Sequence, residues 1–190
     1  MDGEFSYRDA WADHIDDKSV WVRFWALWEL RRKWKWADWF YRQVDRIPEP
    51  HGGEIVEPQA WGTTSGIDYM KLCMWISLLR SVHEGLTTGL DANDTLKQHR
   101  IPITEVFSDL PNGIETLPKF PYRGFRNKVF HCQWHTGSPE LRLDSDATNQ
   151  LEAFHNELGD WLKQAHLAVY PDFKAKYNAP DYYAFAPDHL

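Results

Sequence analysis

Residues 65–88, SGIDYMKLCMWISLLRSVHEGLTT, would form a helix with little polar surface. Its apolar side chains are Met70, Cys73, Met74, Trp75, Ile76, Leu78, Leu79 and Val82. A helix that is apolar on most of its faces is buried among other elements. The segment therefore predicts the most buried helix of a helical bundle, around which the rest of the chain has to pack.

A long helical pattern precedes this segment and covers residues 19–44, with Ser19 as its N-cap. Tryptophans at spacings of three, four and seven residues predict an apolar stripe on one face: Trp21, Trp25, Trp28, Trp36 and Trp39. The opposite side is predicted to carry Arg23, Arg31 and Asp38. The stripe suits core or dimer packing; stacking on unpaired bases, with Arg31, Arg32, Lys33 and Lys35 close by, is the alternative.

A second long pattern follows the central segment and covers residues 147–170, where Pro171 is predicted to end the helix. Its predicted core face holds Leu151, Phe154, Leu158, Trp161, Leu162, Ala165 and Val169. A fourth helix is predicted from Pro121 or Tyr122 to Trp134, after a partly helical connection interrupted by prolines.

Four long helices without a convincing strand pattern predict an all-α bundle with short extra helices. The length of 190 residues suits a single domain over residues 1–190. We expect its core at about 19–170 and an aromatic C-terminal tail at 171–190, which packs along the domain or a partner.

Composition limits the compartment and the kind of partner. The net charge of -7 argues against coating nucleic acid through bulk charge, but it leaves room for a local basic pocket. The two cysteines, Cys73 and Cys132, stand among apolar neighbours and predict buried free thiols in a reducing cytoplasm. The acidic start Met1-Asp2-Gly3-Glu4 does not fit a signal peptide, and no segment is long and uncharged enough to span a membrane.

The predicted fourth helix carries Arg126, Asn127 and His131 within six residues. Asn127 and His131 are one turn apart and share a face, and Arg126 can reach that face with its long stem. RNA cleavage without a metal needs a base for the 2′-hydroxyl, an acid for the leaving oxygen and a cation for the charged phosphorane. His131 fits the base or acid role and Arg126 the cation role.

These residues resemble the R-x4-6-H signature of the HEPN superfamily. The wider stretch from Arg123 to Gln133, RGFRNKVFHCQ, looks like the R-x-x-R-N-x-x-F-H-x-Q pattern of a little-characterised HEPN-like group. That group also has an upstream apolar helix ending in Glu-Gly, which Glu84-Gly85 matches. The resemblance covers roughly residues 65–170.

The resemblance implies an endoribonuclease that needs no metal or other cofactor and acts as a homodimer. It further implies RNA as substrate and a role in RNA-targeting defence or toxin-like growth control, with a cognate antitoxin or defence partner. Arg126, Asn127 and His131 would be the catalytic set. In a symmetric dimer two copies of His131 would come together.

Four further residues are weaker members of this site. Glu84 either pairs with Arg126 or His131 and orients the site, or faces solvent near the helix end, and both roles stay open. Gln133 is a supporting residue, and Arg123 and Lys128 are predicted RNA contacts whose alternative is solvated surface.

His131 and His135 are also one turn apart, but a third ligand is not evident, so no metal site is predicted. The other histidines, among them His155 and His166, are predicted to be surface or helix-face residues. Arg126 and His131 have the structural alternative of only capping and pairing within the bundle. Two further alternatives to the nuclease remain: a non-catalytic HEPN-like module that binds RNA, a nucleotide or a protein, and a purely structural oligomer-former.

Overall fold

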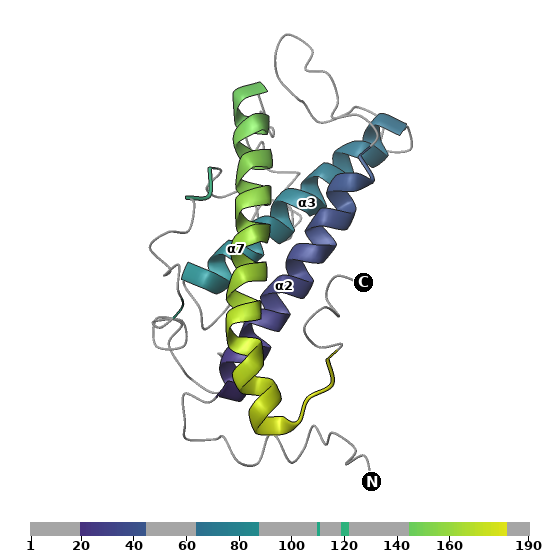
Figure 1. Ribbon diagram of the computed structural model, residues 1–190. Helices are drawn as coiled ribbons and strands as arrows, with labels where there is room; N and C mark the ends of the chain where they lie inside the picture. Colours follow the sequence, from purple (N-terminus) through teal and green to yellow (C-terminus); the bar gives the residue numbers. More distant parts are fainter. Residues whose placement is uncertain (1–19, 45–63, 88–109, 111–118, 122–144, 182–190) are drawn as a thin grey trace. The chain divides into compact units, whose positions relative to one another are not determined.

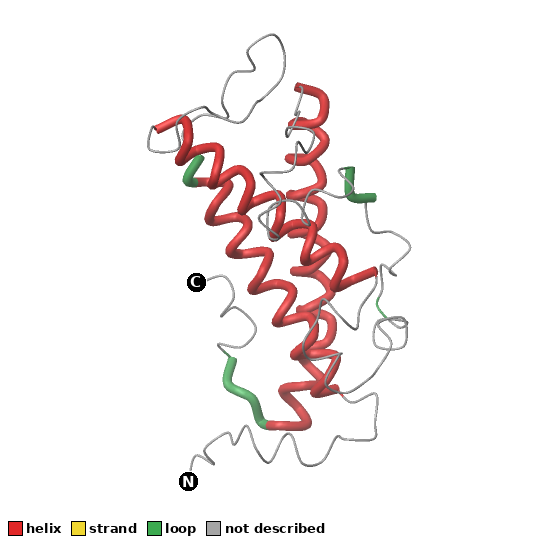
Figure 2. Tube along the Cα trace, turned by 180° about the vertical axis from the view of Figure 1, so that it is seen from behind, coloured by secondary structure: helices red, strands yellow, loops and turns green. Residues whose placement is uncertain are grey.

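The computed structural model describes residues 20–44, 64–87, 110, 119–121 and 145–181. Three long α-helices make up most of this part: α2 (Val20–Arg42), α3 (Thr64–Thr87) and α7 (Ser145–Tyr177) (Figure 1). The described ranges contain helices and loops but no strand, as the tube in Figure 2 shows. The prediction of an all-helical protein is therefore confirmed for this part of the chain.

The chain divides into two compact units. Of the described residues, the first unit holds 20–32, 84–87, 110 and 159–181, and the second holds 33–44, 64–83, 119–121 and 145–158. Each long helix thus contributes one stretch to each unit. The predicted fourth helix, with Cys132 in it, lies outside the described residues.

In the first unit α2 and α7 pack through aromatic rings. The rings of Phe24 and Phe173 stack at 3.7 Å between centroids and 7° between planes, and Trp25 meets Phe173 edge-on at 6.1 Å. Offset or edge-on aromatic pairs add stability beyond the area that they bury. Val22, Leu27 and Leu30 are fully buried beside these rings, so the beginning of α2 is enclosed on nearly all sides.

Helix α7 does not end at Pro171, and that prediction is wrong: the helix continues to Tyr177. A proline inside a helix removes one backbone hydrogen bond. The buried Phe173 lies beyond the proline, and its stacking on Phe24 favours continuation of the helix. Asn178, with φ of 49°, then takes the left-handed conformation that commonly follows a helix C-terminus. The predicted tail therefore starts later than residue 171.

The second unit is built around Trp75 of α3, whose side chain is fully buried. Tyr41 of α2 packs on it at 4.7 Å between ring centroids. Phe120 and Phe154 meet edge-on at 5.2 Å, and Arg80 lies over the Phe120 ring. The seven residues predicted for the core face of α7 are all buried. Three of them belong to this unit, Leu151, Phe154 and Leu158, and four to the first unit, Trp161, Leu162, Ala165 and Val169.

Helix α3 is close to its predicted bounds, and its central apolar residues Cys73, Ile76 and Leu79 are buried, Cys73 as a free thiol. Met70 was predicted to share that burial but is exposed, as is Ile67. Both lie in the first two turns of α3, before its buried apolar residues begin at Leu72. None of the described helices is long and apolar enough to cross a membrane.

The predicted polarity of α2 is only partly correct. Trp21 and Trp25 are buried as predicted, but Trp36 and Trp39 are exposed. Arg31 and Asp38, predicted on the polar side, are buried. Near Arg31 the helix is buried on nearly all faces, so its side opposite the tryptophans does not face solvent. Near Asp38 the inward face consists of the buried Ala37 and Asp38 and the half-buried Trp34 and Tyr41.

Candidate functional site

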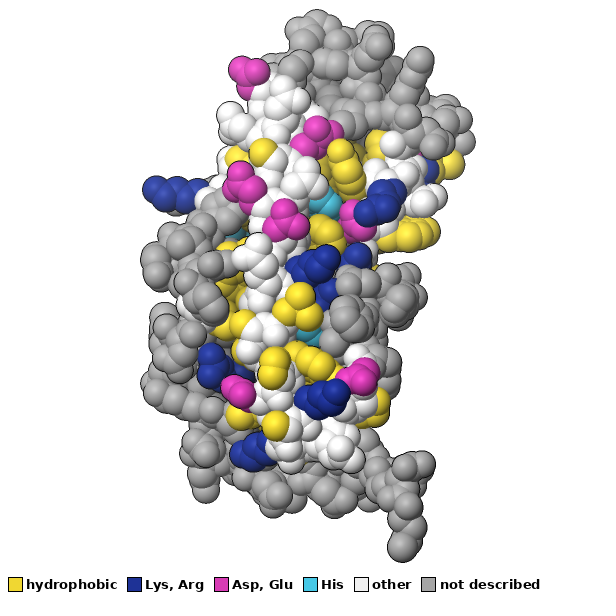
Figure 3. Space-filling view, in the orientation of Figure 1, with side chains coloured by type: hydrophobic (Ala, Val, Ile, Leu, Met, Phe, Trp, Pro, Cys, Tyr) yellow, Lys and Arg dark blue, Asp and Glu magenta, His cyan; other side chains and the backbone are white. Residues whose placement is uncertain are grey.

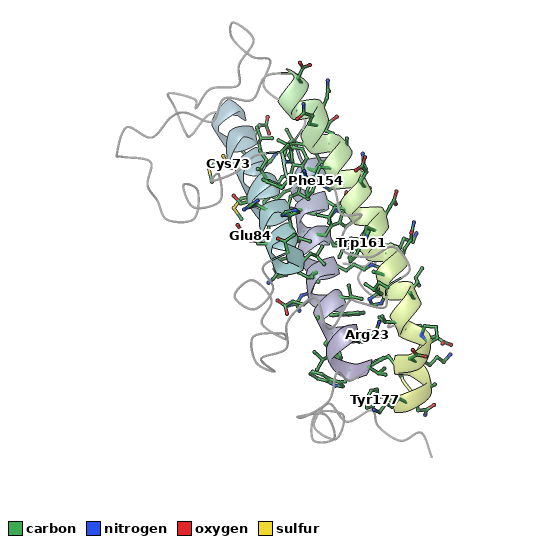
Figure 4. All side chains as sticks on the ribbon, turned by 90° about the vertical axis from the view of Figure 1, so that its left-hand side faces the viewer. Arg23, Cys73, Glu84, Phe154, Trp161 and Tyr177 are labelled. Atoms are coloured by element: carbon green, nitrogen blue, oxygen red, sulfur yellow. The ribbon has the colours of Figure 1, made fainter. Side chains whose placement is uncertain are left out.

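Most residues of the predicted nuclease site lie outside the described residues: Arg123, Arg126, Asn127, Lys128, His131 and Gln133. Glu84 is the exception. It lies in the last turn of α3, where its side chain is half-buried (Figure 4). The partners predicted for it, Arg126 and His131, belong to the undescribed part, so both roles of Glu84 remain predictions.

The described residues contain a buried polar group in the second unit, which we call the His155 cluster. It comprises Asp38, Tyr41 and Arg42 of α2, Trp75 of α3, and Glu152 and His155 of α7. His155 lies at its centre and is 1% exposed. Three helices therefore contribute side chains to one polar group inside the core.

The contacts of His155 fix which ring nitrogen carries the proton. The indole Nε1–H of Trp75 donates to Nδ1 of His155 over 3.1 Å, and an indole nitrogen can only donate. Nδ1 is therefore unprotonated, and in the neutral ring Nε2 carries the hydrogen. Nε2 lies 3.3 Å from Oδ1 of Asp38, to which it donates. The arrangement requires a neutral His155.

Burial also favours the neutral form of His155. Desolvation lowers the pKa of His155 below its ordinary value of 6.5, and the positive charge of Arg42 adds to that effect. The hydrogen bond to Asp38 and the charges of Asp38 and Glu152 oppose it without reversing it. Asp38 itself is held at its other oxygen, Oδ2, by Nε of Arg42 at 3.0 Å.

The remaining contacts bind α2 to α7. The hydroxyl of Tyr41 donates to Oε1 of Glu152 over 3.0 Å, and Nε1–H of Trp34 donates to the backbone carbonyl of His155 over 3.0 Å. Burial, followed by the neighbouring Glu152, raises the pKa of the Tyr41 hydroxyl. The Trp34 ring also stacks on the imidazole, with 4.9 Å between centroids.

A histidine paired with an aspartate can act as a base, but the His155 cluster is not arranged for that. A base needs a free lone pair that points at a substrate. Here Nδ1 accepts from Trp75, Nε2 donates to Asp38, and the ring is out of reach of solvent. The cluster therefore joins three helices and does not form a reaction centre.

Sequence reasoning missed this cluster, because His155 was predicted as a surface or helix-face residue and Asp38 as part of a polar side. The sequence does contain a pattern that indicates an inward helix face at Asp38. Trp34, Ala37, Asp38 and Tyr41 follow the i, i+3, i+4, i+7 spacing of such a face. A charged residue on such a face predicts a buried partner.

One face of the described residues is mixed in charge (Figure 3). On the face seen in Figure 3 basic and acidic side chains are interspersed along the helices. Within the described ranges no group of three or more histidine, cysteine, aspartate or glutamate side chains is placed to hold a metal ion. The exposed large apolar side chains among the described residues of the second unit are Trp36 and Trp39 of α2 and Ile67 and Met70 of α3.

Comparisons of the chain with protein-family models, with curated proteins and with solved structures found no match. The function therefore has to be argued from the residues of this chain.

Proposed function

We propose that the chain is a metal-independent endoribonuclease of HEPN type that acts as a homodimer in the cytoplasm. The observation that carries this proposal is the occurrence of Arg126, Asn127 and His131 within six residues, inside the longer pattern from Arg123 to Gln133. The all-helical architecture of the described residues agrees with an all-α nuclease of this kind.

The proposed reaction is an internal transesterification. The 2′-oxygen of a ribose attacks the adjacent phosphorus while the bond from phosphorus to the 5′-oxygen breaks. One histidine accepts the proton of the 2′-hydroxyl and a second acid protonates the leaving 5′-oxygen. The products are a 2′,3′-cyclic phosphate and a 5′-hydroxyl.

In this reaction each residue has one role. His131 is the base or the acid, and in a symmetric dimer the second copy of His131 supplies the other. Arg126 holds the phosphate and offsets the charge that develops on it, and Asn127 orients the site through its amide. Glu84 and Gln133 support this set, and Arg123 and Lys128 contact the RNA backbone.

A non-catalytic HEPN-like module is the second candidate. It is favoured by the net charge of -7, which is unusual for a protein that holds a polyanion. Such a module would use the same residues to bind RNA, a nucleotide or a protein partner and would not break a phosphodiester bond.

The test is cleavage of labelled single-stranded and structured RNAs in excess chelator by the wild type and by Arg126→Ala and His131→Ala variants. His135→Ala is the matched control, since His135 is a histidine four residues after His131 in the sequence and has no assigned role. We expect a loss of at least about 100-fold in both site variants and little change in the control. Folded variants that cleave as well as the wild type would overturn the proposal.

The biological setting follows from the same resemblance. A nuclease of this kind would act in RNA-targeting defence or in toxin-like growth control, restrained by an antitoxin or a defence partner. Expression of the wild type and of His131→Ala in a bacterial host separates these possibilities from a housekeeping role, because only an unrestrained active nuclease should arrest growth.

A further inference from the structure

In the second unit three hydrogen bonds join α7 to the other two helices at a single residue, His155. Its ring accepts from Trp75 of α3 at Nδ1 and donates from Nε2 to Asp38 of α2. Its backbone carbonyl accepts from the indole of Trp34, also of α2. A change that displaces the His155 ring therefore loosens α7 from both neighbouring helices.

A second proton on the ring is such a change. The charged imidazole carries a hydrogen on each nitrogen, so one N–H would face the indole N–H of Trp75. Turning the ring over does not help, because both of its nitrogens are then donors. The His155 side chain is 1% exposed, and a buried donor without an acceptor destabilises the folded state. The charged ring is stable only where its Nδ1–H reaches water.

The charges around the ring do not remove this cost. The charged and titratable groups near it come from two helices: Asp38, Tyr41 and Arg42 of α2 and Glu152 of α7. Helix α3 adds Trp75, which does not titrate. The two carboxylates favour the charged ring and the guanidinium opposes it, but burial outweighs them, so the pKa of His155 lies below its ordinary value of 6.5.

The ring has no way out while the three helices stay in contact. Between ring centroids, the imidazole lies 4.9 Å from Trp34 and 5.1 Å from Tyr41, both of α2. The Trp75 ring of α3 lies 5.9 Å away on the same measure. Aromatic side chains of both neighbouring helices thus enclose the imidazole. Water reaches its Nδ1–H only after this part of α7 has moved away from them.

We propose that His155 is a pH switch: its protonation opens the second unit, while the first unit stays closed. In the first unit α2 and α7 pack through the stacked rings of Phe24 and Phe173, and neither ring titrates. The inference goes beyond the proposed nuclease and does not depend on it. All of the contacts that carry it lie between described helices, and its test contains no RNA.

Cys73 of α3 reports the open form, because it is a free thiol of the second unit and is 3% exposed. The test measures the rate at which iodoacetamide labels Cys73 in the full chain with Cys132→Ser, which leaves one thiol. This rate is divided at each pH by the rate for the same chain unfolded in urea, because the thiolate is the reactive form in both.

The ratio of the two rates should rise roughly 3-fold to 10-fold when the pH falls from 7.5 to 5.5. The reason is that His155 binds a proton near its ordinary pKa in the open form and only at lower pH in the closed form. A ratio that does not change over this interval would overturn the inference.

Two variants test whether His155 is the cause. His155→Gln keeps a donor and an acceptor but does not titrate, so its ratio should not change with pH. Trp75→Phe removes the N–H that opposes a proton on Nδ1, so its ratio should rise less. A rise in either variant that equals the rise in the parent chain would overturn the inference.

His166→Gln is the matched control. His166 is a second fully buried histidine but belongs to the first unit, where its ring lies 5.1 Å from that of Phe24 between centroids. The variant should keep the full rise at Cys73. Loss of the rise would assign the effect to His166 and overturn the inference.

A thiol in the first unit tests whether the opening is confined to the second. Ala165→Cys, in a chain with Cys73→Ala and Cys132→Ser, places the single thiol at a position of α7 that is 5% exposed. Its ratio should stay the same from pH 7.5 to 5.5. An equal rise at this position would mean that the whole chain unfolds, and a switch in the second unit would be ruled out.

Discussion

The imidazole of His155 holds its proton on Nε2 because Trp75 donates to Nδ1. A second proton on Nδ1 would set an N–H group against the indole N–H in a site without water-exposed surface. Folding therefore selects the neutral ring. The charged and titratable groups near it are Asp38, Tyr41 and Arg42 from α2 and Glu152 from its own helix. Trp75 of α3 and Trp34 of α2 also contact the ring.

This selection predicts how the stability depends on pH. The unfolded chain binds a proton at His155 below about pH 6.5, whereas the folded chain, with its lowered pKa, does not yet bind one. The free energy of unfolding should therefore fall as the pH drops from 7.5 to 5.5. Chemical unfolding at both pH values measures this change.

The control for that measurement is His155→Gln, which keeps a donor and an acceptor but does not titrate. The variant should lose less stability than the wild type over the same pH interval. An equal loss in both proteins would show that His155 does not contribute.

Asp38 is the second residue whose contribution can be measured. Asp38→Ala removes the acceptor of His155 Nε2–H and the partner of Arg42, and it leaves a buried donor without its bond. We expect a loss of about 1–3 kcal/mol in the free energy of unfolding. Asp160→Ala, at an exposed position of α7, should change it by no more than about 0.5 kcal/mol.

At the scale of elements, the packing of Phe173 explains why α7 continues beyond Pro171. Phe173→Ala removes the ring that stacks on Phe24 and meets Trp25, and it leaves a cavity in the first unit. We expect a loss of about 3–5 kcal/mol in urea unfolding. Asp172→Ala is the neighbouring exposed control and should cost little. An equal cost in both variants would show that packing of the Phe173 ring is not the cause.

The sequence predicted the helices well where apolar residues recur at one helical spacing or fill most of the segment. The burial of the seven core positions of α7 follows from their spacing, and the burial of the centre of α3 follows from its run of apolar residues. The prediction was wrong where the preference of a single residue was outweighed by its contacts with residues of another helix. Pro171 favours a helix end, yet the packing of Phe173 outweighs it, and Asp38 favours a polar side, yet His155 and Arg42 provide partners within the core.

At the scale of the whole molecule, the sequence predicted an all-helical class because no segment alternates apolar and polar residues in the manner of a strand, and the described residues agree with it. The His155 cluster was not predictable as a group, since Asp38, Trp75 and His155 are far apart in the sequence and meet only through packing. The proposed nuclease site is different, because Arg126, Asn127 and His131 are neighbours within one segment and were found by their spacing in the sequence.

Assembly gives a further prediction at this scale. If two chains form one composite site, the wild type should be a dimer in light scattering after size exclusion, and His131→Ala should remain a dimer while losing activity. A variant that became monomeric would instead assign His131 to assembly, as in the structural alternative.

The chemistry of the RNA ends tests the central proposal most directly. RNA cleaved by the wild-type chain in excess chelator should carry a 2′,3′-cyclic phosphate and a 5′-hydroxyl when the fragments are weighed by mass spectrometry. A strand with a single 2′-deoxy nucleotide at the cleaved position should resist. Ends with a 3′-hydroxyl and a 5′-phosphate, or intact RNA across a broad panel of single-stranded and structured substrates, would contradict the account.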